Sequence, residues 1–285
     1  MTDHSPTDRR SVLAAATRRL ADAGVPSPEY DAAELLAHVL GTTRADLFAV
    51  ETVPPDRLVE LDALVDRRAC REPLQHLTGI AHFRHVSLAV GPGVFVPRPE
   101  TELLAGWAIE VATRHDSPVV LDLGTGSGAI AAAVADEVPS AEVHALELDE
   151  RAHEWAARNL AGTGVDLRQG DLTTAFDDLA GRVDVIASNP PYIPLSAWES
   201  VAPEARDHDP ELALWSGGDG LDAIRSLEAR AAVLLRVGGV IGVEHADAQG
   251  ETAPAVFTDS GRWTEVKDHR DLADRPRFLT ARLAR

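Results

Sequence analysis

Apolar side chains in the first 80 residues recur at intervals of three and four, which is the spacing of amphipathic helices. Breaks that contain glycine and proline divide this pattern into four predicted helices. They are a helix capped by Ser11 and ended at Gly24, one over residues 31–40, a short one over 44–50, and one opened by Pro54-Pro55. The segment 1–80 is therefore predicted to form a small helical bundle.

The apolar period shortens to about two residues after His82, as expected for strands. Alternating apolar positions over 83–90 are followed by Gly91-Pro92-Gly93, which is typical of a turn, and residues 94–96 form a second apolar run. The pattern predicts a β-hairpin linker over residues 81–100, with its turn at the Gly-Pro-Gly segment.

Helical and strand patterns alternate from residue 101 to the end of the chain, residue 285. Strands are predicted over 119–123, 142–148, 183–188 and 239–244, and helices over 102–114, 128–137, 150–160 and 221–237. Such alternation is typical of an α/β fold with a parallel, doubly wound, Rossmann-like sheet. Sheets of this kind bind their ligands at the carboxyl ends of the strands.

Composition narrows the possible classes of protein. No apolar run approaches the roughly 20 residues that a bilayer span requires, and the polar N-terminal segment lacks the apolar core of a signal peptide. Cys70 is the only cysteine, so no internal disulfide can form. We therefore expect a cytoplasmic protein with no membrane association.

The charge balance bears on the choice of partner. The chain has 27 basic and 46 acidic residues and a formal net charge of −19. Binding to nucleic acid depends on lysine and arginine side chains that neutralise phosphates. This composition argues against direct nucleic-acid binding and is compatible with a basic protein partner.

A glycine-rich loop follows the predicted strand at 119–123 and leads into an alanine-rich helix. It consists of Gly124, Thr125, Gly126, Ser127 and Gly128 and is preceded by Asp122. Glycines let the backbone turn sharply and let a ligand approach it closely. Asp122 could hold an amino-acid end of that ligand, and Glu147, at the end of the next strand, could accept hydrogen bonds from two ribose hydroxyls. The loop alone would also suit a nicotinamide cofactor, or an ordinary strand-to-helix turn.

The segment Asn189-Pro190-Pro191-Tyr192 directly follows the strand predicted at 183–188. Two prolines fix the backbone and remove two N–H donors. The remaining polar groups are acceptors, namely the Asn189 side-chain oxygen and the Pro190 carbonyl, and Tyr192 offers a flat face. This arrangement suits a planar –NH2 group, in which both hydrogens can be bound.

A planar amide or aniline nitrogen is a poor nucleophile because its lone pair is delocalised. Two fixed acceptors can support its growing acidity and hold it in line with an electrophilic methyl group. Positioning and electrostatics of this kind can supply roughly 7–11 kcal/mol. The tetrapeptide therefore predicts methyl transfer to a planar nitrogen, with S-adenosyl-L-methionine as the methyl donor.

Other polar residues have simpler interpretations. Thr101 could cap the helix that follows it. Glu244 and His245, at a predicted strand end, are interpreted as structural because methyl transfer to an amide needs no base there. The acidic and histidine residues at 207–209 have no companions that would complete a metal site, so no metal is expected.

The ordered motifs resemble the PrmC/HemK family, the protein-(glutamine-N5) methyltransferases that modify bacterial peptide chain release factors. The resemblance covers nearly the whole chain. It is carried by DAAELLAHVLG at 31–41, REPLQHLTG at 71–79, VPRPETE at 96–102, the glycine loop with Glu147, the segment 189–192, and EARDHDPELALWSGGDGL at 204–221. Two departures are Glu147, where the family usually has Asp, and Asp209, where it has Glu, so no role is assigned to Asp209.

The resemblance implies a class I methyltransferase domain over 101–285 and a release-factor-binding domain over 1–80, in a protein that we expect to be a monomer. It implies that the glutamine of a Gly-Gly-Gln motif binds Asn189 and the Pro190 carbonyl. It also places Asp171 and Leu172 beside the cofactor, with Leu172 where some members have an aromatic residue against adenine. The roles of Glu100 and His245 stay open.

Three alternatives remain at this point. An amino methyltransferase acting on adenine or guanine would share the tetrapeptide, although the charge and the lack of a basic stripe oppose it. A nicotinamide-dependent oxidoreductase would explain the glycine loop and leave residues 189–192 without a function. A non-catalytic binding module would use the helical domain alone.

Overall fold

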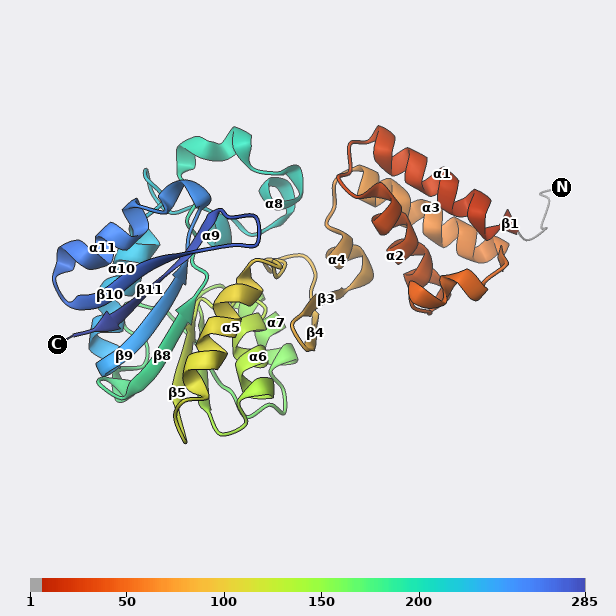
Figure 1. Ribbon diagram of the computed structural model, residues 1–285. Helices are drawn as coiled ribbons and strands as arrows, with labels where there is room; N and C mark the ends of the chain where they lie inside the picture. Colours follow the sequence, from red (N-terminus) through yellow and green to blue (C-terminus); the bar gives the residue numbers. More distant parts are fainter. Residues whose placement is uncertain (1–6, 285) are drawn as a thin grey trace. The chain divides into compact units, whose positions relative to one another are not determined.

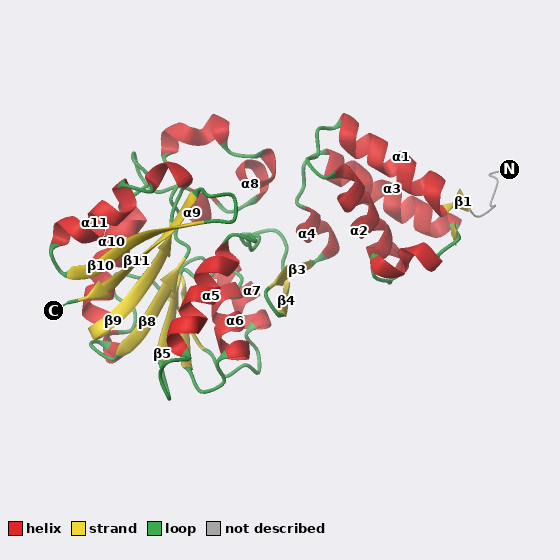
Figure 2. Cartoon of the chain, in the orientation of Figure 1, coloured by secondary structure: helices red, strands yellow, loops and turns green. Residues whose placement is uncertain are grey.

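The computed structural model describes residues 7–284, which form two compact units (Figures 1 and 2). The first unit runs to Ile80 and also contains Ala202–His208. The second comprises Ala81–Val201 and continues from Asp209. One short helix of the first unit therefore comes from the middle of the sequence that builds the second.

Helices pack around an apolar core in the first unit, as the periodicity predicts. Leu20, Leu35, Leu36 and Val65 are fully buried in this core. The elements are β1 (Thr7–Asp8), α1 (Arg9–Asp22), α2 (Pro28–Leu40), the 3-10 helix η1 (Ala45–Ala49), β2 (Thr52–Val53), α3 (Pro55–Ala69), α4 (Leu74–Thr78) and α8 (Pro203–His208).

Two details of the helix starts differ from the prediction. Asp8, and not Ser11, caps α1, because the Asp8 carboxylate accepts a hydrogen bond from the Ser11 backbone N–H at 2.9 Å. Helix α2 begins at Pro28, which fits the first turn because proline lacks the N–H that would be unsatisfied there. Gly41 ends α2 in the left-handed conformation.

Partly buried ion pairs hold α8 in the first unit. The Glu204 carboxylate accepts hydrogen bonds from Arg71 Nε at 2.7 Å and from Arg68 Nη2 at 2.9 Å. Arg68 also donates to Asp31 at 2.7 Å. Although burial opposes ionisation, the two arginines lower the pKa of Glu204 to about 2. Helix α8 is thus attached to this unit by charge-assisted hydrogen bonds that each require a charged partner.

A seven-stranded sheet forms the centre of the second unit, in the order β10-β11-β9-β8-β5-β6-β7. The strands are β5 (Val119–Leu123), β6 (Glu142–Glu147), β7 (Asp166–Gln169), β8 (Val183–Ser188), β9 (Leu235–Glu244), β10 (Trp263–Arg270) and β11 (Pro276–Leu283). Strands β5 to β9 pair in parallel, whereas β11 is antiparallel to both β9 and β10. The prediction of an α/β Rossmann-like sheet is confirmed, and the expectation that it is wholly parallel is wrong at this edge.

Helices cover both faces of the sheet (Figure 1). One face packs against α5 (Thr101–Ala112), α6 (Ala129–Glu137) and α7 (Glu150–Asn159), and the other against α10 (Asp222–Leu234) and α11 (Thr252–Ser260). The remaining helical segments are η2 (Asp177–Leu179), η3 (Leu195–Ser200), α9 (Glu211–Leu214) and η4 (Asp247–Gln249). The apolar strands are buried on both faces, which explains their continuous hydrophobic runs.

The hairpin before the sheet has its turn at a different place from the one predicted. Strands β3 (Ile80–Phe83) and β4 (Val86–Ala89) pair with each other around Arg84 and His85, and Arg84 has a positive φ of 51°. Val94 and Val96 are buried and Phe95 is half-buried, but residues 94–96 form no strand. Helix α10 is also shorter than predicted, because the chain becomes extended at Leu235.

No helix within residues 7–284 has both the length and the apolar character required to cross a bilayer.

The packing of α5 on β9 predicts the effect of a single methyl group. A Cβ atom at Gly242 would lie 2.5 Å from Trp107 Cζ3 and 2.7 Å from Leu104 Cδ1. We expect Gly242→Ala to lower the free energy of unfolding by about 1–3 kcal/mol through overpacking. Urea denaturation measures this loss, and Gly218→Ala is the control because no atom lies within 4 Å of its added Cβ. Equal denaturation midpoints for the two variants would contradict the packing described here.

Candidate active site

Strand register brings the motifs of the second unit to one edge of the sheet. Leu123 pairs with Leu146, and Glu147 pairs with Gln169, so the glycine loop and the segment after β7 begin beside Glu147. On the other side of β5, Asp122 pairs with Ala187 of β8. All these strands are parallel, so their carboxyl ends coincide, which is where ligands bind in such sheets.

The glycine loop takes a backbone conformation that only glycine adopts readily. Gly124, Gly126 and Gly128 have φ values of 76°, 58° and 88°. A Cβ at Gly124 or Gly126 would meet no atom within 4 Å, whereas one at Gly128 would lie 3.1 Å from Leu160. The first two glycines therefore leave the backbone open to a ligand, and the third permits close packing between α6 and the end of α7.

Asp122 is a buried carboxylate that the protein satisfies only in part. Its Oδ2 accepts hydrogen bonds from Thr125 Oγ1 at 2.6 Å and from the Ala131 backbone N–H at 3.1 Å. Its buried Oδ1 has no partner within residues 7–284. Burial raises the pKa of Asp122 to about 7. A cationic ligand group that reached this carboxylate would satisfy Oδ1 and favour the charged form.

Glu147 is held by the backbone around it. Its Oε2 accepts from the Gly126 N–H at 2.8 Å, and its Oε1 accepts from the N–H groups of Leu148 and Asp149 at 2.8 and 2.9 Å. Burial raises the pKa of Glu147, while these three hydrogen bonds favour ionisation. A carboxylate has about four lone-pair sites, so an acceptor site remains for a ligand hydroxyl. The Glu147 carboxylate is therefore fixed by three backbone hydrogen bonds.

Asp171 and Leu172 follow β7 at the same edge. Asp171 is exposed and accepts hydrogen bonds from the backbone N–H and hydroxyl of Thr173 at 2.8 and 2.7 Å, which shapes the turn. Leu172 is half-buried and packs against the core below α10. An apolar side chain and a local turn thus border the space beside Glu147.

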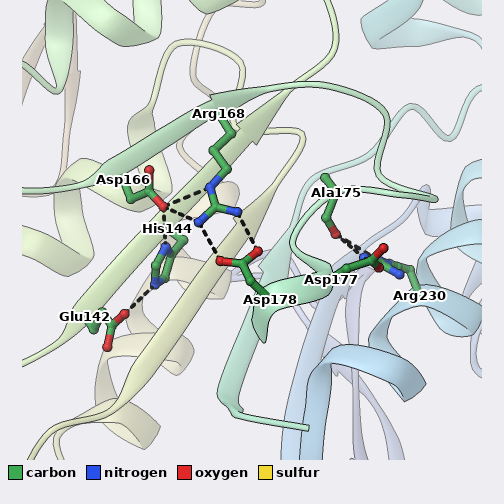
Figure 3. Close-up of polar contacts among 8 residues, drawn as sticks. All are labelled: Glu142, His144, Asp166, Arg168, Ala175, Asp177, Asp178 and Arg230. Carbon is green, nitrogen blue, oxygen red and sulfur yellow. Dashed lines mark hydrogen bonds and ion pairs between the residues drawn. The ribbon is translucent and has the colours of Figure 1, made fainter. Parts of the chain in front are cut away.

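A charged network fixes the stretch that follows Leu172 (Figure 3). Arg168 of β7 donates to both carboxylate oxygens of Asp178 at 2.7 and 2.9 Å and also donates to Asp166. Arg230 of α10 donates to Asp177 at 2.6 Å. His144 of β6 lies between Asp166 and Glu142 at 2.9 and 3.0 Å. These contacts connect β7 and α10 directly to η2, and they connect β6 to it through Asp166 and Arg168.

Asn189 lies where β8 ends, and its amide has a defined orientation. The strand end is fixed by the buried Ser188 hydroxyl, which donates to the Leu123 carbonyl at 2.5 Å. Asn189 Nδ2 donates to Thr101 Oγ1 at 3.1 Å. Because the amide nitrogen faces Thr101, the amide oxygen faces the other way and is available as an acceptor. Pro190, which has no N–H, is buried directly after it, and Pro191 is half-buried.

Tyr192 is positioned by contacts at both ends. Its hydroxyl donates to Glu244 Oε1 at 3.2 Å, and its backbone carbonyl accepts from Gln249 Nε2 at 3.0 Å. Burial and the nearby Glu244 carboxylate raise the pKa of Tyr192, so the phenol stays protonated. The ring is therefore held as a flat neutral surface beside Asn189.

Thr101 and Glu244, which contact Asn189 and Tyr192, have roles that differ from those predicted from the sequence. Thr101 does not cap α5: the cap position is Glu100, which makes no side-chain capping bond. The Thr101 hydroxyl instead donates to Glu244 Oε2 at 2.7 Å, and both side chains are buried. Glu244 was interpreted as a structural residue, yet it contacts Tyr192 directly. A charged residue at the end of a buried apolar strand was the available signal, although it does not indicate a partner.

The linker motif also contacts the segment after the tetrapeptide. Arg98 donates to Asp209 Oδ2 at 2.6 Å, and Asp209 is buried. Burial raises the pKa of Asp209 to about 6, against the opposing effect of Arg98. His245, by contrast, bonds to Asp268 at 3.0 Å and to the Ala246 carbonyl. Among the described residues there is no group of three or more side chains that could hold a metal ion.

Comparison with known proteins matches both units to families. Residues 11–79 match the PrmC N-terminal domain, and residues 99–204 match the methyltransferase small domain. The release factor glutamine methyltransferase of Streptomyces coelicolor is 59% identical over 95% of this chain and 97% of its own length. The protein of that name from Mycolicibacterium smegmatis is 46% identical over 98% and 99%.

Two further similarities concern chemistry and fold. A 4-amino-L-phenylalanine/4-methylamino-L-phenylalanine methyltransferase of Streptomyces pristinaespiralis is 41% identical over 93% of this chain and 92% of its own length. The solved structure of the hMettl16 catalytic domain, in complex with a MAT2A 3′UTR hairpin, has a TM-score of 0.54 and 13% identity, covering 68% of this chain and 75% of that chain. The latter similarity supports the methyltransferase fold of the second unit.

The buried charge of Asp122 predicts a pH-dependent effect on stability. Its pKa is about 7 in the folded protein against an ordinary value of 3.8. Between these values the folded state binds the additional proton, so stability falls as the pH rises through this window. We expect Asp122→Asn to raise Tm above that of wild type at about pH 8, with a much smaller difference near pH 4.

Scanning calorimetry at both pH values measures this difference. Asp178→Asn is the control, because Arg168 lowers the pKa of that exposed carboxylate to about 2. Its substitution should lower Tm at the higher pH. A Tm for Asp122→Asn below that of wild type at the higher pH would contradict the buried, partly satisfied charge.

Proposed function

The chain belongs to the release factor glutamine methyltransferase family, and from this premise we propose that it methylates the glutamine of the Gly-Gly-Gln motif in a peptide chain release factor. The methyl group goes from S-adenosyl-L-methionine to the side-chain amide nitrogen, N5. The observation that carries the proposal is the orientation of Asn189, whose amide nitrogen bonds to Thr101 and whose oxygen is left for the substrate.

The substrate amide has two N–H bonds, and the site offers two acceptors. Asn189 Oδ1 would accept one hydrogen bond and the Pro190 carbonyl the other. With both hydrogens bound, the nitrogen is held so that its remaining face points to the reacting methyl group. Tyr192 packs against the plane of the amide, and this position is fixed by Glu244 and Gln249.

The chemistry of transfer explains why acceptors are needed and a strong base is not. Bound S-adenosyl-L-methionine supplies an electrophilic methyl group on a sulfonium ion. As the nitrogen forms its bond to the methyl carbon, the carbon–sulfur bond would break and leave a neutral thioether. The nitrogen would gain positive charge and release one proton to solvent. Asn189 Oδ1 and the Pro190 carbonyl stabilise that charge where it develops, which is the form of catalysis that fixed dipoles provide.

The residues of the glycine loop fit the cofactor. Asp122 has an unsatisfied buried oxygen that an α-ammonium group would complete, and Glu147 retains acceptor capacity for ribose hydroxyls. Gly124 and Gly126 leave the backbone of the Gly124-Thr125-Gly126-Ser127-Gly128 loop open to close approach. Asp171 and Leu172 would border the adenine.

The first unit would bind the protein substrate. Its match to the PrmC N-terminal domain supports this role, and the net charge of −19 for the whole chain is compatible with a basic protein partner. Residues 1–80 would thus act as the release-factor-binding domain, 81–100 as the linker, and 101–285 as the catalytic domain.

A second candidate substrate follows from one relative. The Streptomyces pristinaespiralis protein is named for an amino acid with an aniline nitrogen, which is also planar and weakly nucleophilic. Residues 189–192 alone would suit either an amide or an arylamine. The higher identity to release factor glutamine methyltransferases favours the amide.

The substrate proposal predicts site-specific labelling. Purified protein, tritiated S-adenosyl-L-methionine and a bacterial release factor should give labelled factor, and a factor with Gln→Ala in its Gly-Gly-Gln motif should stay unlabelled. Tandem mass spectrometry should place one added methyl on that glutamine. Equal labelling of both factors, or transfer to 4-amino-L-phenylalanine only, would overturn the proposal.

The role of Asn189 predicts a catalytic defect. Asn189→Ala removes one positioned acceptor, which is typically worth about 10²-fold or more in rate. Single-turnover methyl transfer measures this loss, and calorimetry should show a smaller decrease in cofactor affinity. Near-normal turnover of the variant would show that Asn189 is not the acceptor.

A further inference from the structure

Glu244 is a buried carboxylate that contacts two side chains of the candidate active site, and its contact with Thr101 has no part in the proposed chemistry. It ends β9, is fully buried, and lies beside the end of β8 because Ser188 pairs with Val243. Each of its two oxygens accepts a hydrogen bond from a different side chain of the site. Oε2 accepts from the Thr101 hydroxyl at 2.7 Å, and Oε1 accepts from the Tyr192 hydroxyl at 3.2 Å. Glu244 thus connects Thr101, which contacts Asn189, with Tyr192.

Glu244 sets the direction of each hydrogen bond in the series Asn189–Thr101–Glu244. An ionised carboxylate can only accept, so the single proton of the Thr101 hydroxyl is used toward Glu244. Toward Asn189, Thr101 Oγ1 can then act only as an acceptor. Asn189 must therefore turn its –NH2 group to Thr101, as observed, and its oxygen the other way.

We propose that Glu244 is a positioning residue that sets, through Thr101, which end of the Asn189 amide faces the methyl-accepting nitrogen. The proposal rests on the proposed function for the identity of that nitrogen. If the polarity of the chain were reversed, Asn189 would present N–H donors to a substrate –NH2, and the two groups would repel each other. Through Tyr192, the same carboxylate also fixes the flat surface of the site.

The charges around Glu244 define when it acts as an acceptor. Burial raises the pKa of Glu244 to about 7, aided by Glu100, while the hydrogen bonds from Thr101 and Tyr192 and the charge of Arg277 favour ionisation. Arg277 lies on β11 next to Glu244, since Phe278 pairs with it, and donates to Asp271 at 3.2 Å. A protonated Glu244 would have to donate a hydrogen bond to Thr101 or Tyr192 and would so disturb the contact that orients one of them. Activity should therefore fall as the pH drops through about 7.

The first test compares two buried carboxylates of the second unit. Glu244→Gln keeps the shape and removes the acceptor-only character. Glu228→Gln is the matched control, because Glu228 of α10 is also buried and accepts hydrogen bonds from Arg262 and Trp263, which are not part of the candidate active site. We expect Glu244→Gln to lower kcat about 10- to 100-fold because the Asn189 amide is misoriented. Cofactor affinity should be unchanged, and the decrease in activity below about pH 7 that is attributed to Glu244 should disappear. Glu228→Gln should keep the wild-type kcat and pH profile.

The second test uses the relay atom itself. Thr101→Val removes the hydroxyl with little change in shape, and Thr101→Ser restores it. We expect the valine variant to lose as much kcat as Glu244→Gln and the serine variant to approach wild type. Because both residues act in one chain, the double variant Thr101→Val/Glu244→Gln should be no slower than either single variant.

The outcomes separate this inference from the proposed function. Wild-type kcat in Glu244→Gln with an unaltered pH profile, or equal activity of the serine and valine variants, would overturn the relay. An inactive wild-type protein would overturn the release-factor proposal alone. The relay would then be decided by denaturation midpoints, where additive effects of Thr101→Val and Glu244→Gln would show that the two side chains are not coupled.

Discussion

Parallel pairing of β5 with β6 and β8 is the constraint on which the rest of the site depends. In a parallel sheet every strand ends at the same edge, so residues that follow different strands become neighbours although they are far apart in the sequence. This pairing places Gly124, Glu147 and Asn189 along one edge. The extension of the sheet through β9 adds Glu244 to the same edge. One strand register therefore places the proposed methyl-donor site and the proposed acceptor site next to each other.

The same edge buries more carboxylate charge than stability alone would favour. Asp122 and Glu244 are both fully buried, and burial raises the pKa of each to about 7. In the proposed function each carboxylate has a role: Asp122 would hold a cationic ligand group, and Glu244 would set the hydrogen-bond polarity of Asn189. Burial of these charges lowers fold stability near neutral pH, and the proposed gain is a site whose acceptors are oriented before the substrate arrives.

Local patterns explain what the sequence could predict. The glycine loop, Glu147 and residues 189–192 each follow directly on an apolar strand, so their common edge could be inferred from alternation alone. The partner of Thr101 could not be inferred from the sequence, because Glu244 is 143 residues away and the contact depends on how α5 crosses the sheet. Strand β10 and the antiparallel pairing of β11 were likewise missed, since no helix separates the two strands. The turn of the hairpin was misplaced because Gly91-Pro92-Gly93 is a stronger turn signal than Arg84-His85.

The central claim is that Asn189 and Pro190 present two acceptors to one planar amide. A crystal structure of the wild-type protein with S-adenosylhomocysteine and a release-factor peptide containing Gly-Gly-Gln tests this most directly. The account predicts that the glutamine amide nitrogen lies within hydrogen-bond distance of Asn189 Oδ1 and the Pro190 carbonyl, with Asn189 Nδ2 still bonded to Thr101. A glutamine amide bound elsewhere, or an Asn189 whose nitrogen faces the substrate, would contradict it.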